Sequence, residues 1–235
     1  MSELKKSVCE YISDNIKRIR YNINEAEAKS GRKENSVRLM AVTKTVDADR
    51  VNFCVEQCGI NLLGENRVQE FLSKEADYAP AEIHFIGALQ SNKVKYIAGK
   101  MSVIETASSE KLLREISRLS PAQDTGVLIE VNIGNEESKS GIRAGSVAEL
   151  NEKLAELAEI AAELPNIELR GLMTIPPFGS EPDRYFAGME QLFRDNERFF
   201  GKEPVLSMGM SGDYETAVRY GANLVRVGTA IFGGR

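Results

Sequence analysis

One lysine of this chain, Lys44, stands where an amine can do covalent chemistry. It closes residues 37–44, a segment whose apolar interior is typical of a buried strand. An ammonium group inside a strand is costly to bury unless it is paired or neutralised. At the carboxyl tip of a barrel strand, the same amine is exposed to a ligand and can attack a carbonyl group. The simpler alternative is a lysine that only snorkels to solvent past the strand end.

Apolar strands and helical segments alternate along the whole chain. Strands are expected at residues 37–44, 60–64, 82–87, 101–106, 126–132, 169–175, 205–211 and 223–228. Helices are expected between them at residues 46–58, 65–77, 91–99, 108–119, 146–164, 183–200 and 213–220. Near-continuous apolar strands that alternate with helices favour parallel pairing with both faces covered. Eight such units in 235 residues predict an α/β fold, a single (β/α)8 TIM barrel. A doubly wound open sheet is the alternative.

The N-terminal segment predicts an extra helix. Apolar residues recur at helical spacing over residues 3–29, and the chain ends just after the eighth strand. This first helix would then cover the barrel wall that a final helix normally covers. We therefore expect one domain over residues 1–235, in which residues 1–36 form the N-terminal helix that packs on the barrel.

Composition limits the kinds of binding partner and the cellular compartment that we expect for this protein. The formal net charge of −5 argues against a nucleic-acid partner, because no basic surplus is available to contact phosphates. No apolar run is long enough to cross a membrane, and no signal peptide is visible. The three cysteines, Cys9, Cys54 and Cys58, form no CxxC pair and fit a reducing cytoplasm. We expect them to be small buried hydrophobic residues rather than metal ligands, so no metal is predicted.

Two loops near the C-terminus resemble a phosphate site. Ser211 and Gly212 open the helix expected at 213–220, and an anion is favoured at a helix N-terminus. Gly228 and Thr229 end the last strand and offer a close backbone approach and a hydroxyl. A helix cap at Ser211 and a plain strand end at Gly228 would explain each loop alone. At adjacent positions after strands seven and eight, where barrels often bind phosphate, the two loops together favour a phosphate.

Two charged or titratable residues interrupt apolar strands. Arg226 either pairs with a buried carboxylate such as Glu130 or faces a heteroaromatic nitrogen and keeps it unprotonated. His84 is the only histidine, and it is either a core residue satisfied by hydrogen bonds or a support for a ligand. A lysine and a phosphate site across one barrel mouth suggest a phosphorylated aldehyde held as a Schiff base. Pyridoxal 5′-phosphate (PLP) fits, and so do the sugar phosphates of Schiff-base aldolases.

Seven sequence blocks resemble those of a known family, the pyridoxal phosphate homeostasis proteins. They run in the same order from about residue 37 to the C-terminus, and they are residues 41–44, 64–70, 84–93, 138–141, 171–175, 206–213 and 225–233. The resemblance implies a fold similar to the N-terminal barrel of alanine racemase, which is fold type III among PLP-binding proteins.

The resemblance also implies the cofactor-binding residues. Lys44 would form the internal aldimine with PLP, and Arg226 would face the pyridine nitrogen. Asn66 and His84 would lie near the cofactor. The residues that would hold the phosphate or lie beside it in the matching blocks are Met208, Ser211, Gly212, Gly228 and Thr229.

The family is thought to buffer and deliver PLP in vitamin B6 homeostasis, so we expect this protein not to be an enzyme. We expect a monomer or weak homodimer whose partners are cofactor-free enzymes. Catalysis with PLP usually needs a protonated ring nitrogen, and Arg226 would weaken that electron sink. Alanine racemase also needs a tyrosine from a second domain, which we do not expect in this chain. A PLP-dependent racemase-like enzyme is the alternative, with Lys139, Tyr214 or Tyr220 as the second base.

Overall fold

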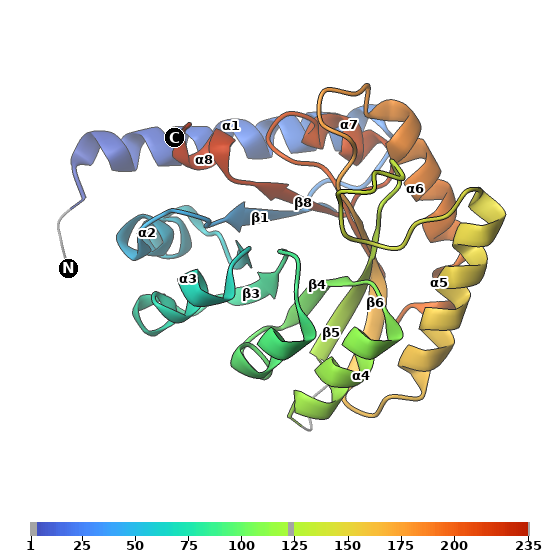
Figure 1. Ribbon diagram of the computed structural model, residues 1–235. Coiled ribbons are helices and arrows are strands. Elements are labelled where there is room, and N and C mark those ends of the chain that lie inside the picture. The colour runs from blue at the N-terminus through green and yellow to red at the C-terminus, as the bar shows by residue number, and fades with distance from the viewer. Residues whose placement is uncertain (1–3, 122–124, 235) are drawn as a thin grey trace.

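The fold is a closed barrel of eight parallel strands (Figure 1). The computed structural model describes residues 4–121 and 125–234. The strands are β1 Arg38–Val42, β2 Leu62–Glu65, β3 Glu82–Phe85, β4 Val103–Ala107, β5 Thr125–Val131, β6 Ile167–Thr174, β7 Val205–Ser207 and β8 Leu224–Val227. They pair in chain order, and β8 closes the barrel against β1. The predicted (β/α)8 barrel is confirmed, and the open doubly wound sheet is not found.

Helices connect the strands around the outside of the barrel. They are α1 Lys6–Lys29, α2 Ala48–Cys58, α3 Val68–Leu72, α4 Glu110–Leu119, α5 Val147–Ala162, α6 Asp183–Asp195, α7 Tyr214–Arg219 and α8 Thr229–Phe232, with 3-10 turns η1 Glu75–Asp77, η2 Ser91–Tyr96 and η3 Glu197–Phe199. The helices expected at 65–77 and 91–99 are shorter than predicted, and α8 was not predicted. Helix α8 is a single turn, too short to show an apolar period in the sequence.

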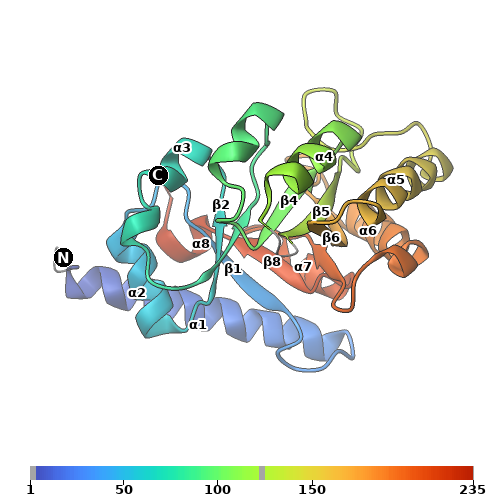
Figure 2. The same ribbon diagram turned by 90° about the horizontal axis from the view of Figure 1, so that it is seen from below.

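Helix α1 covers the barrel wall beside β8 and β1, as expected. It lies along α8 and α7 in Figure 1 and along α2 in Figure 2. Its buried face consists of isoleucines spaced three or four residues apart, which form one stripe on a helix. The Asn15 side chain donates a hydrogen bond of 2.9 Å to the carbonyl of Ile231 in α8. These isoleucines are Ile12, Ile16, Ile19 and Ile23.

The hydrophobic core has an outer and an inner part. Residues that point outward from the strands, such as Ala41 and Leu63, pack against the helices. Their inward-pointing neighbours fill the barrel interior with two small apolar clusters, one around Met40 and Leu62 and the other around Leu128. Between these clusters, inward positions carry buried polar and charged side chains. The interior of this barrel is therefore partly ionic.

The three cysteines differ in their burial. Cys54 is buried in the outer core, and burial together with Cys58 raises the pKa of its thiol to about 12. Cys9 and Cys58 are partly buried, and all three thiols are free. Within residues 4–121 and 125–234, no helix is long and apolar enough to cross a membrane. No group of three or more potential metal-ligating side chains was found in the same ranges.

Candidate functional site

A cavity of about 310 Å³ lies at the carboxyl ends of β1, β2 and β8. Lys44 enters it two residues after the end of β1, and Asn66 enters it directly after β2. Gly228 and Thr229 line the other side, directly after β8. Four of the predicted site residues therefore meet in one cavity at the mouth of the barrel.

Lys44 presents an unpaired amine to this cavity. Its side chain is partly buried, and its Nζ makes no hydrogen bond or ion pair with any residue that the structure describes. Lys74 nearby is different, because its Nζ donates to the carbonyls of Thr43 and Val46 and pairs with Glu70. An amine without a protein partner at a cavity wall is poised to bind a ligand.

The turn that carries Lys44 is strained and firmly held. Thr45 has φ +61°, which is a rare conformation for a β-branched residue. Its backbone N–H donates to the Glu70 carboxylate, and the Thr43 hydroxyl donates to Glu65 Oε1 over 2.6 Å. The Tyr78 hydroxyl donates to the same Glu65 oxygen. Local strain that the surroundings over-determine is common at functional sites.

Asn66 carries a polar atom without a partner. Its Oδ1 is buried and makes no hydrogen bond within the described residues. The backbone around it is close-packed, because a Cβ at Gly87 would lie only 1.9 Å from the Asn66 carbonyl oxygen. A buried polar atom without a partner is costly, so a ligand group is the natural partner for the Asn66 amide.

The two loops that we expected to bind phosphate are hydrogen-bonded to each other. The Ser211 hydroxyl accepts a bond of 3.2 Å from the backbone N–H of Ala230, in the first turn of α8. Gly228 lies close to β1, since its Cβ would be 3.2 Å from the Val42 carbonyl. Thr229 is exposed. Together they form one polar rim beside the Lys44 cavity.

The helix after Ser211 differs from the prediction in one respect. Helix α7 begins at Tyr214, and its N-cap residue is Asp213, whose carboxylate accepts from the backbone N–H of Met210. This carboxylate already lies at the positive end of the helix. The start of α7 is therefore less suited to an anion than Ser211 and the α8 turn. Gly212 is exposed, with open space beside it.

Met208 is fully buried in the outer core and does not line the cavity. It follows β7 directly and leads into the Ser211 loop. Its place indicates a packing contribution to that loop rather than a contact at the cavity wall.

Arg226 is buried inside the barrel and held by neutral groups. One guanidinium nitrogen donates to Ser207 Oγ over 2.6 Å, and the other terminal nitrogen donates to the Thr174 carbonyl over 2.8 Å. Ser207 donates in turn to Glu105 Oε2 over 2.6 Å. No direct ion pair with Glu130 was found within the described residues, although Glu130 contributes to the potential around Arg226. The first of our two alternatives for Arg226, an ion pair with a buried carboxylate such as Glu130, is found only in an indirect form, because Ser207 lies between Arg226 and the buried carboxylate of Glu105.

Burial lowers the pKa of Arg226, and the nearby carboxylates of Glu105, Asp213 and Glu130 oppose this shift. An arginine remains charged even so. Burial would raise the pKa of Glu105, but its hydrogen bond to His84 and the charges of His84 and Arg226 hold it below its ordinary value. A permanent positive charge therefore lies within the barrel, balanced by a buried carboxylate.

His84 lies away from the Lys44 cavity, although it was predicted near the cofactor. Its Nδ1 is 2.7 Å from Glu105 Oε1 and its Nε2 is 2.8 Å from Glu82 Oε1. Burial would lower the pKa of His84, but these two carboxylates raise it above its ordinary value. His84 reaches Arg226 only indirectly, through Glu105 and Ser207.

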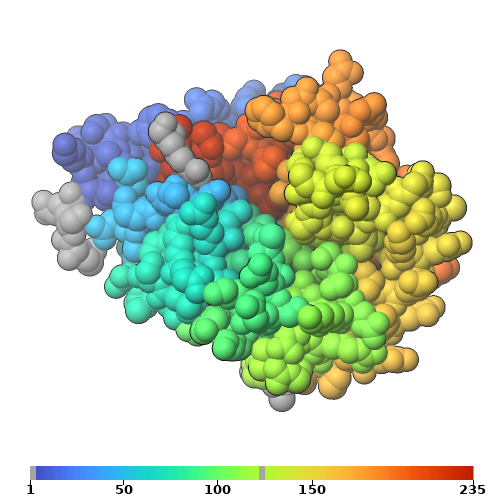
Figure 3. Space-filling model, viewed as in Figure 1, coloured from blue at the N-terminus to red at the C-terminus, as the bar shows by residue number. Residues whose placement is uncertain are grey.

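None of the proposed second bases lines the Lys44 cavity. The Tyr214 hydroxyl accepts a hydrogen bond from Asn22 of α1, on the outside of the barrel. Tyr220 donates to Asp183 at the surface. Lys139 is ion-paired with Glu136, and it also donates to the Pro176 carbonyl. The yellow-green loop of Lys139 lies against the orange loop after β6 in Figure 3.

Sequence reasoning missed the residues that hold the Lys44 turn. Glu65, Glu70 and Tyr78 contact the turn, and Arg50 lines the cavity wall. Glu65 at the carboxyl end of β2 was a signal in the sequence, since an acidic residue is seldom placed in an apolar strand unless other side chains satisfy its carboxylate.

Comparison with known proteins first defines the class. Residues 15–235 match the family model described as alanine racemase, N-terminal domain. A crystal structure of an unknown protein from Bifidobacterium adolescentis is similar over 99% of this chain and 98% of that chain, with a TM-score of 0.85 and 33% identity. The chain therefore has the barrel of this class.

Two further relatives carry informative names. The pyridoxal phosphate homeostasis protein of Aquifex aeolicus is 40% identical over 97% of this chain and 99% of its own length. PipY of Synechococcus elongatus PCC7942, solved with PLP bound, is 30% identical over 90% of this chain and 100% of its own, with a TM-score of 0.72. The chain belongs to the family of pyridoxal phosphate homeostasis proteins.

Proposed function

We propose that this protein binds PLP covalently through Lys44 and acts in vitamin B6 homeostasis in the cytoplasm. It would store the cofactor and deliver it to cofactor-free enzymes. The observation that carries the proposal is the single cavity that Lys44 shares with Asn66, Gly228 and Thr229. The names of the relatives and the PLP bound to PipY support it.

The polar groups at the cavity fit such a ligand. The Lys44 amine has no protein partner, and Asn66 Oδ1 is buried without one among the described residues. When bound, the cofactor supplies an aldehyde that condenses with a primary amine and releases water, together with a phosphate and a pyridine ring. Arg50, which is ion-paired with Asp47 over 3.2 Å, adds a guanidinium group at the cavity wall. The cavity therefore offers an amine, a cation and unsatisfied polar atoms, which a phosphorylated aldehyde would use.

Each residue has a separate task in this proposal. Lys44 binds the aldehyde, and the Ser211 and Thr229 hydroxyls hold the phosphate together with the backbone at Gly228 and Gly212. Arg226 keeps the ring nitrogen unprotonated with its permanent charge. Supporting tasks fall to Asn66, which orients the bound ring, to Met208, which packs in the outer core where the chain leads into the Ser211 loop, and to His84, which acts on Arg226 through Glu105 and Ser207.

A carrier fits this cavity better than a racemase-like enzyme. Proton transfer at an α-carbon in both directions needs two opposed bases. Among the described residues that line the cavity, Lys44 and Arg50 are the titratable ones. If the alternative were true, the protein would exchange α-protons of amino acids for deuterium over many turnovers. We expect no sustained exchange.

Substitution of Lys44 tests the proposal directly. Mixed with PLP, the wild-type protein should gain a visible absorption band, and borohydride should fix the cofactor on the peptide that contains Lys44. At a free cofactor concentration of about 100 times the Kd, binding should add about 2.7 kcal/mol to the free energy of unfolding. Lys44→Ala should lose the band and the adduct and most of this stabilisation.

The matched control is Lys153→Ala. Lys153 is a surface lysine paired with Glu149 in α5, and its removal should leave all three signals unchanged. A wild-type protein that gains no band, or an adduct that maps to a different lysine, would refute the proposal.

A further inference from the structure

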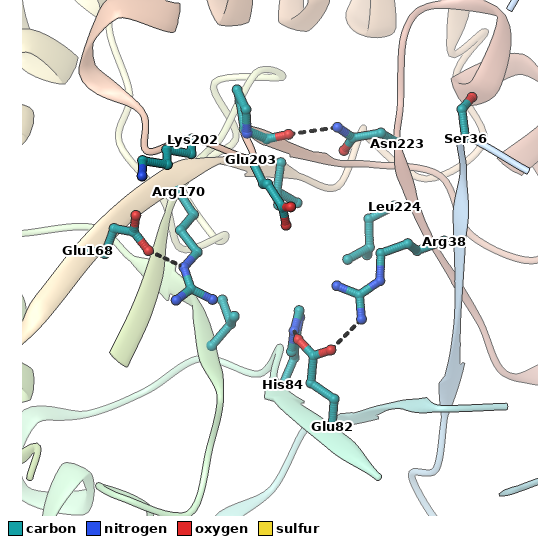
Figure 4. A pocket seen from close by; sticks show the side chains of 13 residues that line it. Ser36, Arg38, Glu82, His84, Glu168, Arg170, Lys202, Glu203, Asn223 and Leu224 are labelled. Atoms are coloured by element: carbon teal, nitrogen blue, oxygen red, sulfur yellow. Dashed lines mark hydrogen bonds and ion pairs between the residues drawn. The ribbon is translucent and has the colours of Figure 1, made fainter. Parts of the chain in front are cut away.

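A second cavity, of about 410 Å³, lies at the opposite end of the barrel from Lys44. Its walls come from the amino-terminal ends of the strands, including Arg38 at the start of β1 and Glu82 at the start of β3. This end of a barrel usually serves stability and is filled by packed side chains. Here it is hollow and lined by charges (Figure 4).

Two arginines face each other across this cavity. Arg170 donates from Nε to Glu168 Oε2 over 2.6 Å, which leaves its two terminal nitrogens directed at the cavity (Figure 4). Arg38 is paired with Glu82 through one terminal nitrogen. His84 lines the same cavity, between Glu82 and Glu105, and these neighbours favour its protonated form. Lys202 lines the cavity as well, so four cationic groups surround one space, together with the carboxylates of Glu82, Glu168 and Glu203.

The backbone is arranged to put Arg170 there. Between β5 and β6, Val127 pairs with Leu169 and Leu128 pairs with Gly171, so Arg170 is the extra residue of a β-bulge. A bulge redirects a side chain and is common beside functional sites. Gly171 has φ +148°, and a Cβ there would lie 2.0 Å from a backbone oxygen of β7.

A glycine on the neighbouring strand makes room for the same arginine. A Cβ at Gly126 of β5 would lie 2.9 Å from Arg170 Cδ and 2.9 Å from Val103 Cγ2. Gly126 and Gly171 each weaken the strand that contains them. Both glycines are explained if the Arg170 guanidinium binds a ligand in the cavity.

The carboxylate of Glu203 shows which ligand chemistry suits the space. It points into the cavity between the two guanidinium groups (Figure 4). Glu203 is exposed, and it forms no ion pair with either arginine in the described part of the chain. An exposed side chain can swing out at little cost. Glu203 therefore resembles a resident carboxylate that a ligand carboxylate could replace.

We propose that this cavity is a second ligand site, which binds a small organic carboxylate between Arg38 and Arg170. The planar forks of the two guanidinium groups match the two oxygens of a carboxylate. Glu203 competes with the ligand for the same cations. The site does not depend on the cofactor, so it stands or falls separately from the proposed function.

Propionate is the probe, measured by ligand-detected NMR on the full chain with and without PLP. Propionate should bind and saturate, whereas propionamide, which has the same shape without the charge, should not. Arg170→Gln should weaken propionate binding about tenfold or more, because a charge-assisted bidentate contact is lost. The matched control is Arg114→Gln, since Arg114 makes the same Nε contact with Glu110 on the surface of α4, and it should bind as the wild type does.

Glu203→Gln keeps the test decisive if Arg170→Gln fails to fold. Because Glu203 is exposed, this variant should fold, and removal of the competing charge should strengthen propionate binding several-fold. Equal binding of propionamide, binding of inorganic phosphate in place of propionate, or weaker propionate binding in Glu203→Gln would each overturn the proposal. Retained binding in a folded Arg170→Gln would overturn it as well.

Discussion

At the scale of single residues, the chemistry of the mouth depends on two unsatisfied groups. Lys44 keeps a free amine because the neighbouring Lys74 takes the nearby carbonyls and carboxylate. Asn66 keeps a buried oxygen without a partner in the described structure. The buried Asn66 oxygen costs stability in the protein alone, and a ligand that donates a hydrogen bond to it would offset that cost. This is the usual conflict between stability and function at a site.

Asn66→Ala should separate these two effects. Because the substitution removes a buried atom without a partner, the free energy of unfolding without cofactor should stay the same or rise by up to about 1 kcal/mol. The affinity for PLP should fall by roughly 2- to 10-fold, the value of one ordinary hydrogen bond. Urea unfolding measures the free energy of unfolding, and a cofactor titration measures the affinity for PLP.

Asn61→Ala is the control, because Asn61 is exposed just before β2. It should change neither quantity. If Asn66→Ala instead lowered the stability of the cofactor-free protein and left the affinity for PLP unchanged, Asn66 would be a structural residue.

At the scale of elements, α1 supports the site from outside. It seals the wall beside β8, and Asn15 holds the carbonyl of Ile231 in α8. The same α8 turn holds Ser211 through Ala230. The N-terminal helix is therefore connected to the polar rim by two hydrogen bonds and the turn between them, so we expect its packing to affect the geometry of that rim.

Ile16→Ala should show this connection. Ile16 is 1% exposed in the buried stripe of α1, and the cavity left by the substitution should lower the free energy of unfolding by about 2–5 kcal/mol. The affinity for PLP should fall as well, because α8 loses support. Tyr21→Ala, on the side of α1 where Tyr21 is 64% exposed, should alter stability by less than about 0.5 kcal/mol. Equal effects of both variants would contradict the assigned packing.

At the scale of the whole molecule, a series of polar side chains, buried from His84 onward, runs from the amino-terminal end of the barrel into its interior. It runs from Arg38 through Glu82, His84, Glu105 and Ser207 to Arg226, and each neighbouring pair is joined by a hydrogen bond or an ion pair. Positive and negative charges alternate along this series of side chains, so each buried ion has a neighbour of opposite charge. One end lines the cavity beside Arg170, and the other end is Arg226, two residues before Gly228 in the Lys44 cavity.

This series of polar side chains predicts that the stability of the protein depends on pH. The pKa of His84 is raised in the folded protein, so its contribution is complete below about pH 6.5 and is lost as the pH rises through the folded value. The hydrogen bond to His84, together with Arg38, lowers the pKa of Glu82 to about 2. Its contribution is present above its unfolded pKa of 4.5 and is lost as the pH falls toward 2.

His84→Gln tests this at pH 5, 7 and 9 by urea unfolding. The loss of stability relative to the wild type should be largest at pH 5 and should shrink as the pH rises. In the same variant Glu82 should titrate at a higher pH, which NMR of its side chain can follow. A loss of stability that is the same at all three pH values would show that His84 is not charged in the folded protein.

The sequence by itself determined the barrel and the residues at its mouth. Apolar strands and helices alternate with local periods, and all parallel strands end at the same mouth. Lys44, Asn66, Gly228 and Thr229 could therefore be assigned from their places just after strands, and they do share a cavity. The mouth was predictable because position along each strand is a local property.

Only the tertiary structure decided what the inward side chains contact. Glu105 of β4 contacts His84 and Ser207 of β7 contacts Arg226, and these two partners are 102 residues apart. Such pairs depend on strand register and on the bulge at Arg170, and neither is written in a local pattern. The fold therefore placed His84 in the barrel interior, turned Tyr214 and Tyr220 away from Lys44, and opened the cavity beside Arg170.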